Sequence, residues 1–163
     1  MKTKLLLSVL LAAALIIPAF GKTFKIPDEE SFASITIPDD WKSKEIDSGV
    51  ESQSPDDEVY FYVEATDAKG MDKAIVEAVE YLSGQGVTVD DKTMKQSEGK
   101  INGMDGVDVT WSGKDKEGAA IISLTILAAS KEKVLLIAYW GSPDGTKKHD
   151  KVLGEILKSI KKV

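Results

Sequence analysis

Only one side chain in the sequence has an ordinary pKa close to neutral pH. His149 is the sole histidine, and neither cysteine nor arginine occurs. A zinc site built from several histidines is therefore impossible unless other residue types supply the ligands. His149 precedes Val152 and Leu153 by three and four residues, on an extension of an apolar helical stripe. We interpret it as a packed or half-exposed helix residue, not as a catalytic base.

Carboxylates are more abundant, with 27 Asp plus Glu against 21 basic residues. Clusters at predicted turns, Asp39-Asp40, Asp56-Asp57-Glu58 and Asp90-Asp91, carry the kind of oxygen that calcium binds. None has the alternating spacing and glycine of a calcium-binding loop, so we expect solvated turns and no metal site. A calcium-stabilised structural protein remains one alternative.

No pattern in the sequence indicates an enzyme. The Gly-x-Ser-x-Gly elbow and both common phosphate-binding loops are absent. We therefore expect no catalytic residues and no cofactor. An exported hydrolase that uses only carboxylates remains the second alternative, because the sequence does not exclude a cleft with two acids about 5 to 9.5 Å apart.

Aromatic residues offer the best candidate for a binding surface. Tyr60 and Tyr62 share one face of a predicted strand, while Val59, Phe61 and Val63 share the other. Exposed tyrosines here would form a binding platform, because each combines contact area with a polar tip. The alternative is burial with the hydroxyls at the rim of the sheet. The three tryptophans are expected to anchor the core, at Trp41, Trp111 and Trp140.

Two amphipathic helices are predicted. Apolar residues recur at steps of three and four from Met71 to Leu82, and Gly84 and Gly86 suit the C-terminal end of that helix. A second stripe runs from Val152 to Ile160, and Ser142-Pro143-Asp144 is typical of its start.

The remaining periodicity predicts an antiparallel sheet. Alternating or apolar runs indicate strands at residues 33–37, 45–47, 50–54, 59–63, 93–97, 107–112, 119–128 and 134–140. The connections at 113–118 and 130–133 are too short for a crossover, so these neighbours should form a meander. Asn102-Gly103 marks a further tight turn. The runs at 119–128 and 134–140 are apolar on both faces, which places them in the middle of the sheet.

The first 21 residues have the order of a cleavable signal peptide. Lys2 and Lys4 precede an apolar run, Leu5–Ile17, and small residues Ala19 and Gly21 follow. The run is shorter than the roughly 20 residues that cross a bilayer, so no membrane span is expected after cleavage. Residues 22–163 are then one domain, periplasmic or secreted. Its acidic balance and lack of arginine make nucleic acid a poor partner.

The chain resembles the PsbP-like and Mog-like superfamily over about residues 31–160. The resemblance lies in an opening strand that ends in proline with a tryptophan one turn later (Ser34–Trp41), the Ile101–Gly103 turn and the closing Ile156–Ile160. It implies an α+β fold, an α/β/α sandwich in which helices flank a curved antiparallel sheet. It also implies a binding or accessory module, and it transfers no individual site residue.

These observations favour an exported, non-enzymatic accessory or binding module. Its partner would be an unidentified protein or small molecule of the cell envelope. Tyr60 and Tyr62 are the candidate ligand-binding residues.

Overall fold

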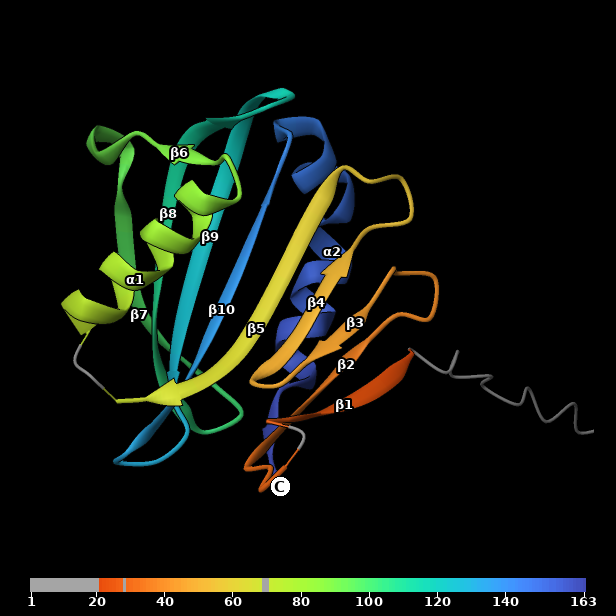
Figure 1. Cartoon of the computed structure of the whole chain (residues 1–163), viewed down its shortest axis with the longest axis vertical. Helices are drawn as coiled ribbons and strands as arrows, with labels where there is room; N and C mark the ends of the chain where they lie inside the picture. The colour runs from red at the N-terminus through yellow and green to blue at the C-terminus, as the bar shows by residue number, and fades with distance from the viewer. Residues whose placement is uncertain (1–20, 28, 69–70) are drawn as a thin grey trace, which may run out of the picture.

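The computed structural model describes residues 21–27, 29–68 and 71–163, which form two antiparallel sheets and two α-helices (Figure 1). The large sheet has eight strands in the order β3-β4-β5-β10-β9-β8-β6, and β7 also pairs with β8. They are Lys44–Ile46 (β3), Gly49–Gln53 (β4), Val59–Asp67 (β5), Thr88–Val89 (β6), Lys95–Ile101 (β7), Met104–Asp115 (β8), Gly118–Ala128 (β9) and Lys133–Gly141 (β10). The small sheet, in the order β1-β2-β11, comprises Lys22–Ile26 (β1), Ala33–Ile37 (β2) and Lys161–Lys162 (β11). The helices are Met71–Gly84 (α1) and Pro143–Ser159 (α2), and a 3-10 turn spans Asp91–Thr93.

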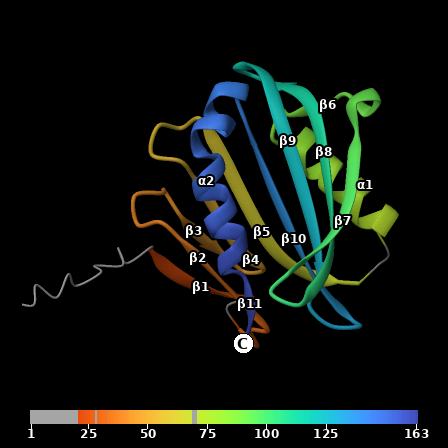
Figure 2. The ribbon, with the colours of Figure 1, turned by 180° about the vertical axis from the view of Figure 1, so that it is seen from behind.

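The elements form layers around the large sheet. Helix α1 packs on one face, and α2 packs with the small sheet on the other (Figures 1 and 2). The predicted fold class, an antiparallel sheet flanked by helices, is confirmed. The predicted meander is also confirmed, because β7, β8, β9 and β10 pair in chain order.

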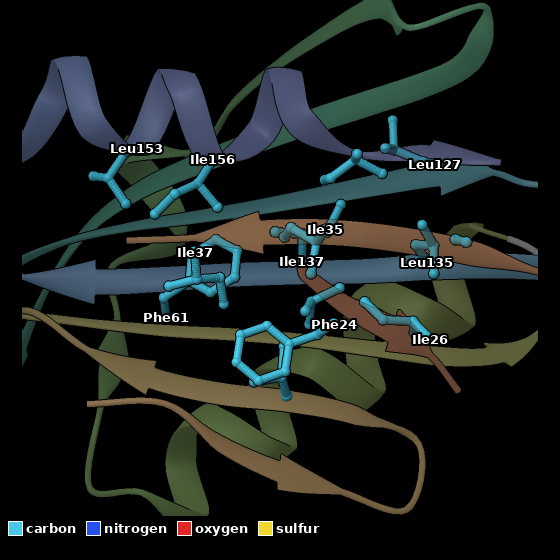
Figure 3. Packing of buried hydrophobic residues seen from close by; sticks show 14 of the residues in the cluster. Phe24, Ile26, Ile35, Ile37, Phe61, Leu127, Leu135, Ile137, Leu153 and Ile156 are labelled. Atoms are coloured by element: carbon cyan, nitrogen blue, oxygen red, sulfur yellow. The ribbon is translucent and has the colours of Figure 1, made fainter. Parts of the chain in front are cut away.

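The larger core cluster lies on the α2 side of the sheet. Figure 3 shows side chains of the small sheet meeting those of the large sheet beneath α2. Its labelled members are Phe24, Ile26, Ile35, Ile37, Phe61, Leu127, Leu135, Ile137, Leu153 and Ile156. Trp41 is buried in the same cluster. The small sheet therefore acts with α2 as the cover for this face.

The second cluster lies between the large sheet and α1. The alternation predicted for β8 holds, since Val107, Val109 and Trp111 are buried on this side. Trp140 of β10 and Leu82 of α1 belong to the same cluster. The three tryptophans are thus core residues, as predicted.

The start of α2 and the end of α1 lie where the sequence signals place them. The Ser142 side chain accepts a hydrogen bond from the Gly145 backbone N–H at 2.9 Å and caps α2, with Pro143 in its first turn. After α1, Gly86 takes a φ of 81°, a left-handed conformation in which a side chain is unfavourable.

The N-terminal part of the domain differs from the expectation. Residues 22–26, for which the periodicity predicted no strand, form β1, which pairs with β2 from Lys22↔Ile37 to Ile26↔Ala33. Strand β2 belongs to the small sheet and not to the large one. The predicted signal peptide lies outside the described residues except for Gly21. No helix in the described ranges is long and apolar enough to cross a membrane.

The β7–β8 turn is bonded to the end of α2. Asn102 and Gly103 both have positive φ, 48° and 82°, as a tight hairpin requires. The Asn102 side-chain amide donates to the backbone carbonyls of Lys158 at 2.7 Å and Ile160 at 2.5 Å. These carbonyls lie at the C-terminal end of the helix, where no intrahelical donor remains.

We predict that Asn102→Asp destabilises the fold. Aspartate fits the left-handed turn but replaces the amide donor with an acceptor facing two carbonyls, so the free energy of unfolding should fall by about 1 to 3 kcal/mol. Denaturant unfolding of residues 22–163 measures the loss. Asn102→Gly keeps the backbone freedom and also removes the amide, so it should be destabilised as well. A glycine variant as stable as the parent would contradict the role of the amide.

Candidate functional site

Helix α1 covers only part of its face of the large sheet. Its main contacts are with β6, β9 and β10, and β3 to β5 extend beyond it (Figure 1). An open groove of about 310 Å³ lies at this border. Its lining includes Tyr60, Tyr62 and Trp140 from the sheet and Tyr81 from α1. We call it the tyrosine groove.

Two pairs of stacked rings form the aromatic part of this groove. Tyr60 of β5 is the cross-strand neighbour of Trp140 in β10, and their rings lie 5.3 Å apart at 8°. Tyr62 stacks on Tyr81 of α1, with centroids 4.5 Å apart and 21° between the planes. Stacking holds the half-buried Tyr60 and Tyr81 rings against the buried Trp140 and Tyr62 rings, so the groove presents an ordered aromatic surface.

The two predicted tyrosines share one face but differ in exposure. Tyr62 is only 7% exposed because Tyr81 covers it. For this residue the alternative of a buried ring is therefore the correct one. Tyr60 is half-buried and borders the groove. The structure therefore brings both residues to one groove, and their role in binding a ligand stays a prediction.

Burial and neighbouring carboxylates raise the pKa of two phenols of this groove, those of Tyr62 and Tyr81. Burial, with smaller contributions from Glu51, raises the pKa of Tyr81 to about 12. Burial, followed by the hydrogen bond with Glu64, raises the pKa of Tyr62 further. The Tyr81 hydroxyl donates to Oε1 of Glu51 at 3.5 Å. At neutral pH these two phenols are thus neutral groups that can donate hydrogen bonds.

Charged and amide side chains form the rim. Lys44 of β3 and Lys116 in the β8–β9 turn make no ion pair within the described residues. Glu51, Gln53 and Gln85 also line the groove. An aromatic surface beside a rim of mixed polar groups is suited to binding a ligand that has a flat apolar face and polar edges.

Sequence reasoning missed Tyr81, Lys44 and Glu51. Tyr81 lies beside Leu82 of the helical stripe, so its aromatic type next to a core position was the available signal. Lys44 and Glu51 are ordinary strand residues in the sequence. They become groove residues only because β3 and β4 pair beyond the end of the α1 cover.

His149 lies in a polar cluster away from the groove. Its Nε2 is 2.9 Å from Oδ1 of Asp56. Its ring lies nearly perpendicular to the Trp41 ring, with 5.7 Å between the two ring centroids. The side chain is 12% exposed, so the prediction of a packed or half-exposed helix residue is confirmed. Asp56 also accepts from Lys148 and from the buried Ser54 hydroxyl. The Lys148 hydrogen bond holds the pKa of Asp56 well below its usual range.

Members of two of the acidic clusters have separate structural roles. Asp90 accepts from the Lys92 backbone N–H and caps the 3-10 turn. Asp57 pairs with Lys42, and the Glu58 side chain accepts from the Ser142 hydroxyl at 2.5 Å. In the part of the chain that the structure describes, no three His, Cys, Asp or Glu side chains are grouped to hold a metal ion.

Comparison with known sequences gives no relative: no family model matches the chain, and no curated protein matches it. Solved structures do match. The chain is similar to the cyanobacterial PsbP protein CyanoP from Synechocystis (TM-score 0.62, 8% identity, 94% of this chain and 99% of that chain). It is also similar to the Ran-binding protein Mog1p of Saccharomyces cerevisiae (TM-score 0.52, 8% identity, 86% and 95%).

Two further similar structures are bacterial. LpqN, described as involved in cell envelope biogenesis of Mycobacterium tuberculosis, matches with a TM-score of 0.59 at 10% identity over 87% of this chain and 91% of that chain. A Bacteroides thetaiotaomicron protein matches with a TM-score of 0.59 at 16% identity over 88% of this chain, which spans about half (49%) of that protein's length. The chain thus has the PsbP/Mog1-like fold that the sequence motifs suggested.

We predict that Asp56→Asn lowers stability in a pH-dependent way. Because the folded-state pKa of Asp56 is depressed, its contribution is present above the unfolded-state value and is lost as the pH falls below about 4. At pH 7 the variant should lose about 1 kcal/mol of unfolding free energy, since the ion pair with Lys148 is partly exposed. Denaturant unfolding from pH 7 to pH 3 measures the difference between the two proteins, which should shrink with acidity.

Asp57→Asn is the matched control, because Asp57 is adjacent and its pair with Lys42 is more exposed. This variant should stay close to the parent across the same pH range. A constant difference between Asp56→Asn and the parent from pH 7 to pH 3 would contradict the assignment.

Proposed function

We propose that residues 22–163 act as an exported, non-enzymatic binding or accessory module that holds its ligand in the tyrosine groove. The observation that carries the proposal is the pair of ring stacks, Tyr60–Trp140 and Tyr62–Tyr81, at one open groove. The ligand class that fits is a molecule or protein segment with a flat apolar face and polar edges.

The geometry of the groove supports binding. Tyr60 and Trp140 stand on neighbouring strands of the sheet, so backbone pairing fixes their spacing. Tyr81 is held by its contact with Tyr62 and by Glu51. Side chains that are already ordered lose little conformational entropy when a ligand arrives, which favours affinity.

Two observations outside the groove support the export and envelope part of the proposal. The first 21 residues have the charge, apolar run and small residues of a signal peptide. LpqN, which shares the fold, is described as taking part in cell envelope biogenesis.

We predict that a defined panel of soluble carbohydrates, aromatic amino acids and short peptides contains a ligand of the groove. Titration of isotope-labelled protein, followed by amide NMR shifts, should locate binding at β4, β5 and the end of α1. Tyr60→Ala should weaken that binding about tenfold, because the ring supplies contact area and supports Trp140.

Lys44→Ala and Lys25→Ala form the matched control pair, since each removes one exposed strand ammonium. Lys44 borders the groove and Lys25 lies on β1 of the small sheet. Only Lys44→Ala should change binding. No shift from any panel member, or shifts confined to other surfaces, would contradict the groove assignment.

The export part has its own test. Expression of the full chain in a bacterial host should yield a processed protein outside the cytoplasm, with its N-terminus near Lys22 by intact mass. A variant in which Leu7, Leu10 and Leu11 are replaced by Asp should stay unprocessed, because the apolar run is interrupted. Unprocessed parent protein in the cytoplasm would contradict export.

A further inference from the structure

A second groove lies on the opposite face of the large sheet. Helix α2 contacts β9, β10 and β5, while β8 and β7 extend beyond it (Figure 2). The groove along this border has a volume of about 280 Å³. Ile101, Leu127 and Leu157 contribute apolar walls, and Asp108 contributes a carboxylate. We call it the Asp108 groove.

Two hydroxyls fix the Asp108 carboxylate. Thr125 Oγ1 donates to Oδ1 of Asp108 at 2.8 Å, and Ser123 Oγ donates to the same oxygen at 3.2 Å. Thr125 is the cross-strand partner of Asp108, so the β8–β9 register places these groups together. Both hydroxyl residues are buried, at 6% and 2% exposure.

The second carboxylate oxygen is left without a partner. Within residues 21–27, 29–68 and 71–163, Oδ2 of Asp108 accepts no hydrogen bond, and no lysine pairs with the carboxylate. Lys100 also lines the groove, but its ammonium pairs with Asp105 at 2.7 Å. The groove therefore holds a positioned carboxylate that forms no ion pair with a described lysine.

A second acidic side chain, Glu98, also lines the groove beside the paired Lys100. The carboxylates of Asp108 and Asp150 both act on Tyr139. Burial raises the pKa of Tyr139 first, the Ser123 hydrogen bond opposes the rise, and the two carboxylates add to it. The phenol is therefore a neutral hydrogen-bonding group beside an acidic site.

We infer that the Asp108 groove binds a small organic ammonium ion, with the cationic nitrogen at Oδ2 of Asp108 and the apolar part against Leu127 and Leu157. A single fixed carboxylate provides a charge-assisted hydrogen bond to an ammonium group. The apolar walls suit a hydrocarbon substituent and do not suit a hydrated metal ion, which needs several oxygen ligands. The volume lies near the lower end for small-molecule pockets, which favours a free amine of modest size.

The test uses hexylammonium as the probe and 1-hexanol as its neutral counterpart of equal chain length. Titrated into isotope-labelled residues 22–163, hexylammonium should give saturable amide shifts at β8, β9 and the C-terminal half of α2. 1-Hexanol should bind at least about tenfold more weakly, because it lacks the charge that Asp108 recognises.

Asp108→Asn should reduce hexylammonium affinity by about tenfold or more, since the neutral amide cannot supply the charge-assisted bond. Glu117→Gln is the matched control: it removes the same charge from an exposed position in the β8–β9 turn, outside the groove. Thermal unfolding of both variants shows whether they remain folded. Should Asp108→Asn unfold, the comparison of hexylammonium with 1-hexanol on the parent protein decides alone.

Three results would overturn the inference: no saturable binding of hexylammonium, equal affinity for 1-hexanol, or equal affinity in folded Asp108→Asn. The inference is independent of the tyrosine groove, which lies on the other face and has Tyr60→Ala as its own variant. A negative binding result at one groove therefore does not count against the proposal for the other groove.

Discussion

The structure depends on one constraint: a wide antiparallel sheet must bury two apolar faces with only two helices and a small second sheet. The central strands β9 and β10 are buried on both sides, and α1 and α2 cross them on opposite faces. Each helix is too narrow to reach both edges, so part of each face stays open. The small sheet extends the cover of α2 over β4, which explains why this side has the larger core.

Both grooves form where a helix leaves part of a sheet face uncovered. The cross-strand neighbours at each place determine whether the groove is aromatic or acidic. On the α1 side the register places Tyr60 beside Trp140, which gives an aromatic surface. On the α2 side it places Asp108 beside Thr125, which gives an oriented carboxylate. Turn residues hold α2 in place, since Asp56 bonds to its first half and Asn102 bonds to its end.

Local patterns in the sequence determined most of the elements. Alternation at Val107, Val109 and Trp111 predicted a one-sided strand, and the Ser142-Pro143 pair predicted the start of α2. Such signals are local because side-chain periodicity follows directly from helix and strand geometry. The same reasoning placed Tyr60 and Tyr62 on one face. It missed β1, although Phe24 and Ile26 alternate there, and it missed the two-residue strands β6 and β11, because pairings that short depend on a partner strand far along the chain.

Tertiary structure decided how exposed those residues are and which side chains they contact. Tyr62 is covered because Tyr81, 19 positions later in the sequence, stacks on it, whereas Tyr60 lies beyond the end of α1. Asp108 gains its orientation from hydroxyls on the next strand. The sequence by itself thus determined which elements form and which way their side chains alternate. Only the packing of helices on the sheet decided which faces stay open, because that depends on contacts between residues distant in sequence.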